Sequence, residues 1–310
     1  MPRVTTPGFV VTLMLASSIT LSAQESRAPK LSGFLQLRET YQSHLLSATV
    51  NRARVYLDGG LATHFSYRLS ADFGTGGASP GDPLVSLVDA FIRWTPNSAW
   101  GFTVGQFKTP FSREYLLQPS AIEMADRAAV TESLPPKRDI GVMASYAMGS
   151  TATVLVGAFN GEGDNAVSNT DSTILAVGRV TVRPIEHVDV GANVAAYSSD
   201  STRYGVDGMI TSGPASTRVE YIGEHRAAGG KDDYGWYVIA AYRVEPHVQL
   251  VLRQEDLRRP AVAEPRNIAT TAGANLDSTD RHVRLTVDYV SRQIGAVRSG
   301  TVVAQLQLNF

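Results

Sequence analysis

The chain has 310 residues, and its 28 lysines and arginines against 29 aspartates and glutamates give a formal net charge of -1 at pH 7. This balance gives no general attraction to nucleic acid or to anionic lipid. The sequence has no cysteine, which excludes disulfides and thiolate metal sites, and its 43% of hydrophobic residues is typical of a folded chain rather than a disordered one.

An export signal is predicted at the N-terminus. Arg3 gives a small positive start, residues 8–21 form an apolar stretch, and Ala23 is a small residue suited to cleavage. Polar residues interrupt the stretch, which is shorter than the about 18 apolar residues that a membrane-spanning helix needs. We therefore expect residues 1–23 to be a cleaved signal peptide and residues 24–310 to form a single exported domain.

Alternating apolar and polar residues organise the first third of the mature chain. The clearest run is 61–73, in which Leu69 lies between Arg68 and Ser70. The pair Gly59-Gly60 in front of it predicts a tight hairpin turn. Shorter runs bring the number of predicted strands in this part to five, at 35–38, 52–58, 61–73, 88–94 and 102–107.

The segment 108–138 interrupts this alternation. Pro110 removes a backbone donor and ends the preceding strand, and Ser120 to Glu123 has the spacing of a capping box, which predicts one short helix. The segment carries charges of both signs. Two interpretations follow from its composition: a constriction loop held against the inner wall of a barrel, or an extracellular loop with solvated charges.

The alternation resumes after the interruption and continues to Phe310. Long polar connections alternate with short ones, as the loops and turns of bacterial barrels do. The last run places Leu306, Leu308 and Phe310 on one face. The eleven further strands, which bring the total to sixteen, are predicted at 139–148, 151–159, 173–183, 187–198, 204–212, 215–225, 234–244, 248–257, 267–275, 282–291 and 301–310.

Alternation alone does not separate a membrane barrel from a soluble β-sandwich, because both have one apolar and one polar face. The number of uniform strands, the aromatic residues near strand ends such as Trp94 and Trp100, and the terminal Phe310 favour the barrel. We therefore expect an all-β, transmembrane, antiparallel β-barrel of about sixteen strands in the bacterial outer membrane, with its apolar face toward lipid. An exported soluble β-sandwich that binds carbohydrate is the alternative.

Two segments around the interruption resemble a known family. Residues 105–115, GQFKTPFSREY, followed by residues 138–142, RDIGV, resemble the phosphate-selective porin O and P family, as do residues 157–165 and 305–310. The resemblance implies a sixteen-stranded barrel, usually a homotrimer, in which 108–138 folds into the pore as a constriction loop. It also implies selection of anions and phosphate, although this chain has shorter loops and fewer lysines than the best-known members.

The candidate pore-lining residues are cationic. Five arginines of the first four strands lie on the face opposite the apolar residues, and guanidinium groups on neighbouring strands can pass an oxyanion from one to the next. Asp58, Asp72 and Asp89 share this face, so ion pairs that only hold the wall are an equal alternative. With two residues at the start of the loop, the candidate anion-binding set is Arg38, Arg52, Arg54, Arg68, Arg93, Lys108 and Arg113.

The function expected from these features is a porin, a passive diffusion channel for small hydrophilic solutes with a preference for anions such as phosphate. The expected partners are these solutes, outer-membrane lipid and further copies of the chain, and no nucleic acid. No metal or cofactor is implied, because the six histidines are never closely spaced, and no Gly-x-Ser-x-Gly elbow of a hydrolase is present. The alternative is a non-conducting structural or adhesive barrel.

Overall fold

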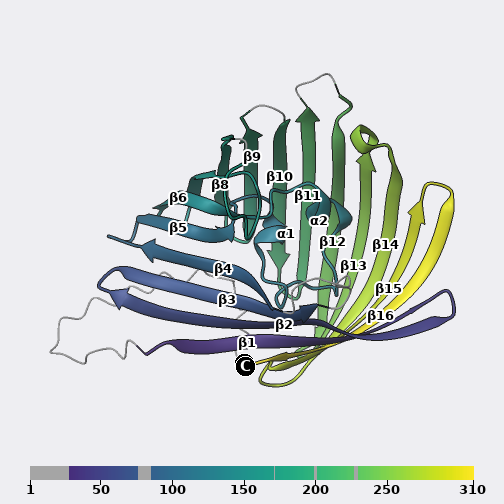
Figure 1. The fold of residues 1–310 in the computed structure, drawn as a ribbon. Coiled ribbons are helices and arrows are strands. Elements are labelled where there is room, and N and C mark those ends of the chain that lie inside the picture. Colours follow the sequence, from purple (N-terminus) through teal and green to yellow (C-terminus); the bar gives the residue numbers. More distant parts are fainter. Residues whose placement is uncertain (1–27, 76–84, 171, 199–200, 227–229) are drawn as a thin grey trace.

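The structure is a computed structural model that describes residues 28–75, 85–170, 172–198, 201–226 and 230–310. Within these ranges, sixteen strands pair in chain order into a closed antiparallel barrel, and β1 (Lys30–Gln42) closes it against β16 (Val297–Asn309) (Figure 1). The predicted architecture and strand number are confirmed. The predicted signal peptide lies outside the described residues.

Each predicted strand overlaps a strand of the structure. Both helices, α1 (Arg113–Leu116) and α2 (Ala129–Ser133), fall in the predicted interruption, and a short 3-10 helix spans Pro260–Val262. No helix in the described part of the chain has the length and apolar character needed to cross a bilayer. The remaining strands are β2 (Leu45–Ala62), β3 (Phe65–Thr75), β4 (Val85–Trp94), β5 (Trp100–Lys108), β6 (Arg138–Met148), β7 (Ala152–Phe159), β8 (Leu175–Ile185), β9 (Val188–Tyr197), β10 (Ser201–Ser212), β11 (Ala215–Arg226), β12 (Asp233–Glu245), β13 (Val248–Arg259), β14 (Glu264–Asp277) and β15 (Val283–Ile294).

Phe310 completes the seam between the first and the last strand. Its backbone nitrogen donates to the carbonyl oxygen of Gly33 at 3.0 Å, and the Gly33 nitrogen donates to the Phe310 oxygen at 2.9 Å. A closed barrel needs this pairing because an open strand edge in lipid would leave backbone groups without partners.

The prediction of a turn at Gly59-Gly60 is wrong. β2 continues through both glycines to Ala62, and the chain reverses at Thr63 and His64, where His64 has the positive φ of 68° that a tight turn requires. Gly59 serves close packing instead, because a Cβ there would lie 2.7 Å from the ring of Tyr67.

The two faces of the strands lie in different environments. On the outer face, Leu69, Val104 and Leu252 expose 47%, 53% and 53% of their surface. On the inner face, polar side chains such as Arg54 and Asp288 are buried. Apolar residues outside and polar residues inside are the arrangement of a membrane barrel, and the closed sheet excludes the soluble sandwich.

The connections at the two ends of the barrel differ in length. At one end they have two to five residues, whereas the other end carries the 109–137 connection between β5 and β6 and the 160–174 connection between β7 and β8. We call this second end the loop end. Its connections at 43–44 and 295–296 are nevertheless only two residues long.

Candidate functional site

Residues 109–137, which we call the inner segment, lie inside the barrel (Figure 1). The backbone nitrogen of Ser112 donates to Asn193 of β9 at 2.9 Å, and that of Ala125 donates to Asp288 of β15 at 2.8 Å. Asn275 of β14 in turn donates to the carbonyl oxygen of Glu123 at 2.7 Å. The segment therefore contacts the wall opposite the strands from which it departs, which a loop on the outside of the barrel could not do.

The helix predicted at Ser120 to Glu123 does not form, because both ends of the expected capping box bind the wall. The Glu123 carboxylate pairs with Arg218, and the Ser120 carbonyl oxygen accepts from Gln307 at 3.0 Å. The capped helix is α1, where the hydroxyl of Ser112 accepts from the Tyr115 nitrogen at 3.2 Å.

Two carboxylates hold the first part of the inner segment. The Glu220 carboxylate accepts from the Ser112 hydroxyl at 3.1 Å, from the Arg113 nitrogen at 2.9 Å and from the Tyr237 hydroxyl at 2.9 Å. Asp207 pairs with the guanidinium of Arg113 at 2.6 Å. Hydrogen bonds to a charged carboxylate are stronger than those between neutral groups, so these contacts fix α1 against β10 and β11.

The wall supplies both hydrogen-bond acceptors and hydrogen-bond donors to the second part of the inner segment. The Ala129 nitrogen, at the start of α2, donates to Glu255 of β13 at 3.2 Å. Arg253 donates to the carbonyl oxygen of Asp126 at 2.7 Å, and Arg38 donates to that of Ala125 at 2.9 Å. Wall carboxylates thus accept from segment N–H groups and wall arginines donate to segment carbonyls, which satisfies the backbone of a non-sheet segment inside the barrel.

Part of the inner wall is apolar, although the apolar face of the strands was expected to lie toward lipid. Phe111, Val130 and Leu134 of the inner segment are almost fully buried in one hydrophobic cluster with wall residues. The sequence carries a sign of this in the unbroken apolar run 175–177, because a strand buried on both faces loses its alternation. The wall residues of the cluster include Phe159, Leu175, Val177, Ala195, Ile222, Tyr237, Ile239, Ala241, Val251 and Leu257.

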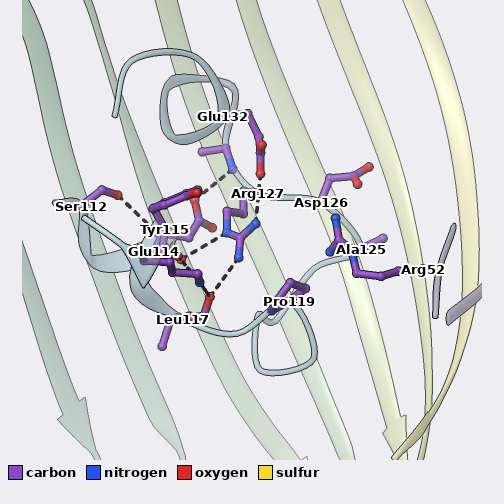
Figure 2. A network of polar contacts seen from close by, with 12 residues as sticks. Arg52, Ser112, Glu114, Tyr115, Leu117, Pro119, Ala125, Asp126, Arg127 and Glu132 are labelled. Carbon is purple, nitrogen blue, oxygen red and sulfur yellow. Dashed lines mark hydrogen bonds and ion pairs between the residues drawn. The ribbon is translucent and has the colours of Figure 1, made fainter. Parts of the chain in front are cut away.

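Lys108 holds the inner segment at its start. Its ammonium group donates to the carbonyl oxygens of Tyr115 at 2.6 Å and Leu117 at 2.7 Å. Arg127 donates to the same Leu117 oxygen at 2.9 Å and pairs with Glu132 at 3.2 Å (Figure 2). Lys108 and Arg127 also lie 5.1 and 5.5 Å from the centre of the Tyr115 ring, so two cations share one aromatic side chain.

Four of the predicted arginines have carboxylate partners. Arg54 binds Asp72 through two hydrogen bonds of 2.6 and 2.5 Å, and Arg68 binds Asp58 through two of 2.7 and 3.0 Å. Arg113 pairs with Asp207, as described above. Arg38 pairs at 2.9 Å with an aspartate of the inner segment, Asp126.

Arg52 and Arg93 are placed differently. Arg52 points toward the inner segment (Figure 2), its side chain is 29% exposed, and its one carboxylate neighbour in the described residues is Asp72 at 3.9 Å, without a hydrogen bond. Arg93 donates to the Thr103 hydroxyl at 3.3 Å and has no carboxylate within ion-pair distance in the described ranges.

The anchoring residues Glu220, Asp207 and Glu255 were recognisable in the sequence only as charges on the lumen face. Their role depends on partners far away in the chain, such as Arg113, which is 94 residues from Asp207. Gly105 of the family-like motif is explained locally, because its φ is 126° and a Cβ would lie 2.1 Å from the Ala90 carbonyl oxygen.

Comparison with known proteins agrees with this architecture. Residues 33–200 match the protein family described as phosphate-selective porin O and P. No curated protein matches the chain. Since the family match covers more than half of the 310 residues, it shows the family and does not rest on a single motif.

Solved structures of outer-membrane proteins share the fold. A loop L8 deletion mutant of OmpT from Vibrio cholerae is similar with a TM-score of 0.70 and 13% identity, covering 91% of this chain and 99% of that one. The outer-membrane channel DcaP of Acinetobacter baumannii has a TM-score of 0.67 and 17% identity, covering 91% and 97%. A mutant of the Rh. blastica porin has a TM-score of 0.64 and 12% identity, covering 91% and 100%.

At such identities these structures show a common fold and nothing about solutes. The sixteen-stranded barrel, the segment folded inside it and the match over residues 33–200 lead to one conclusion. The chain belongs to the phosphate-selective porin O and P family and forms a channel in the bacterial outer membrane.

Proposed function

We propose that this porin lets small hydrophilic solutes diffuse passively across the outer membrane and that it prefers anions, phosphate among them. The observation that carries the proposal is the position of Arg52, a partly exposed lumen cation without a hydrogen-bonded carboxylate in the described part of the chain. Guanidinium groups in this situation attract oxyanions and offer them paired N–H donors.

This preference is supported by a difference between the acidic and the basic side chains of the lumen. Glu220, Glu255 and Asp288 direct their negative charge at backbone N–H groups of the inner segment. Among the described residues Arg93 has no carboxylate within ion-pair distance, and Arg52 has only Asp72 at 3.9 Å, which is itself hydrogen-bonded to Arg54, so the charges of Arg52 and Arg93 are the least compensated of the candidate arginines. We assign these two arginines to solute contact. The other candidates, Arg38, Arg54, Arg68, Lys108 and Arg113, hold the wall and the inner segment.

Replacing Arg52 by glutamine should lower the permeability of chloride relative to potassium. A unit charge 4 Å from an ion contributes about 1 kcal/mol even in bulk water, which is roughly a fivefold effect on partitioning. The measurement is the reversal potential of single channels in a salt gradient. The control is the double variant Asp58→Asn, Arg68→Gln, which removes a bound ion pair without changing the net charge and should leave the reversal potential unaltered. Equal reversal potentials for Arg52→Gln and the wild type would remove Arg52 from the mechanism.

The second candidate, a non-conducting structural or adhesive barrel, is favoured by one observation, the apolar cluster that packs the inner segment into part of the lumen. The same recordings separate the two candidates. Folded protein that gives no current in a planar bilayer supports the second.

We further propose that the functional unit is a homotrimer. A shallow apolar groove of about 640 Å³ runs over the outer face of the barrel, where Ala144, Ala158 and Ala176 lie among larger side chains that include Trp94 and Phe102. Small residues in a lipid-facing surface allow close approach of another protein surface. One similar structure is a trimer form of OmpT from Vibrio cholerae.

Filling the groove should therefore prevent assembly. Replacing Ala158 by tryptophan keeps the surface apolar but blocks close contact, so light scattering in detergent should give three protomers for the wild type and one for the variant. Val206→Trp, on the outer face of β10 away from the groove, should remain trimeric. A trimeric Ala158→Trp variant would show that the groove is not the contact.

A further inference from the structure

A cavity of about 290 Å³ opens at the loop end of the barrel, between the end of the inner segment and β6, β8, β9 and β10. Residues 161–164 of the connection between β7 and β8 form one of its sides. The cavity is at the small end of the size range of ligand pockets, so it suits a small solute. It lies at the mouth and is separate from Arg52 and Arg93.

Two of the six charged groups that line the cavity have an ion-pair partner, and a third, Asp139, is bound by backbone nitrogens. Arg138 pairs with Asp89 at 2.8 Å, and Arg203 pairs with Glu224 at 3.1 Å. The Asp139 carboxylate accepts from the nitrogens of Ile140 at 2.7 Å and Gly161 at 2.6 Å.

Besides Asp139, three charged groups of the lining have no ion-pair partner among the described residues. Lys137 is exposed, and its ammonium group makes neither a hydrogen bond nor an ion pair there. Asp164 likewise has no cationic partner. Glu162 accepts from the nitrogen and the hydroxyl of Thr170 at 2.8 and 2.5 Å, but from no cation. The cavity therefore presents one unpaired positive charge, Lys137, and two carboxylates, Glu162 and Asp164, that are exposed and without a cation, beside the backbone-bound carboxylate of Asp139.

Beside these charges the cavity has an apolar side. Pro135 and Leu175, both buried, form the base of this side, and the partly exposed Tyr197 lies next to them with the Arg203 guanidinium 4.9 Å from its ring centre. A ligand that matches this surface carries a carboxylate for Lys137, an ammonium group for Asp164 and Glu162, and an apolar part for the Tyr197 side.

We propose that this cavity binds zwitterionic solutes, specifically α-amino acids with an apolar side chain, at the mouth of the channel before they enter the lumen. The site is independent of the anion preference proposed above, because it uses different residues. Binding at the mouth raises the local concentration of the solute at the entrance, which increases its flux when the bulk concentration is low.

The experiment is equilibrium binding to the folded full-length barrel in detergent, measured by calorimetry. The probes are L-leucine, leucinamide, which lacks the carboxylate, and N-acetyl-L-leucine, which lacks the ammonium group. We expect L-leucine to bind at least tenfold more tightly than either analogue. Lys137→Gln and Asp164→Asn should each weaken L-leucine binding at least tenfold. Lys137→Gln should leave the weak binding of leucinamide unchanged, because that probe has no carboxylate.

Lys231→Gln, an exposed lysine of another loop-end connection, is the matched control and should bind L-leucine like the wild type. Equal or tighter binding of N-acetyl-L-leucine would make the cavity a simple anion site and overturn the proposal. So would absence of L-leucine binding, or binding that neither Lys137→Gln nor Asp164→Asn weakens. None of these results would alter the reversal-potential test of the anion preference.

Discussion

Replacing Glu220 and Glu255 together by alanine should raise the single-channel conductance and make the current noisier. Each carboxylate accepts hydrogen bonds from the backbone of the inner segment, at the start of α1 and at the start of α2. Hydrogen bonds to a charged group contribute about 1.5–3 kcal/mol each, so losing them at both helices should release the segment from the wall part of the time. A segment that leaves its place opens a wider passage.

Two rim glutamates provide the comparison. The double variant Glu245→Ala, Glu264→Ala removes the same number of charges from exposed positions at the ends of β12 and β14, and its conductance should equal that of the wild type. Retention of the folded barrel is checked by its heat-dependent mobility in gel electrophoresis. If the folded Glu220→Ala, Glu255→Ala variant conducts as steadily as the wild type, the inner segment is not held by these carboxylates.

Replacing Gly235 by valine should have the opposite effect and lower the conductance. Gly235 of β12 faces α2, and a Cβ there would lie 2.9 Å from Cγ2 of Val130 and 3.0 Å from its Cβ. Overpacking of this kind costs about 1–3 kcal/mol, and the short helix can relieve it only by moving away from the wall. Because α2 lies inside the barrel, a helix displaced from the wall moves further into the lumen and should narrow it.

A compensating substitution tests this explanation. Combining Gly235→Val with Val130→Ala removes Cγ2 of Val130, the closest colliding atom of α2, and should restore conductance toward the wild-type value. The contact with the Asp256 carbonyl oxygen, 2.7 Å from the added Cβ, is the same in both variants and cannot account for a difference between them. Failure of Val130→Ala to restore any conductance would mean that α2 is not displaced.

The barrel could be predicted because its physical constraint repeats along the chain. Each strand separates lipid from lumen, so outward residues such as Leu69 and inward residues such as Arg68 alternate regardless of which strands pair. Local patterns were less informative where a distant contact competes with them. Gly59-Gly60 has the composition of a turn but lies under Tyr67, and Ser120 to Glu123 has the spacing of a cap but binds Arg218 and Gln307.

For the site, the sequence predicts which side chains face the lumen but not which of them hold the inner segment. The lumen position of the arginines follows from alternation, and the pairing of Arg68 with Asp58 follows from the β2–β3 hairpin, in which the two residues are directly opposite. The anchoring of the inner segment does not follow from any local pattern. Glu220 is 107 residues from the Arg113 nitrogen that it holds, and only the closed barrel brings them together.

The central claim is that polar side chains such as Arg52 face a water-filled passage while apolar ones such as Leu69 face lipid. Because the chain has no cysteine, single cysteine variants can test it directly with an anionic, membrane-impermeant thiosulfonate reagent during bilayer recording. Arg52→Cys should react and its anion current should fall, whereas Leu69→Cys should not react. If Leu69→Cys reacts and Arg52→Cys does not, the assignment of these two faces to lipid and lumen is wrong, and so is the channel that depends on it.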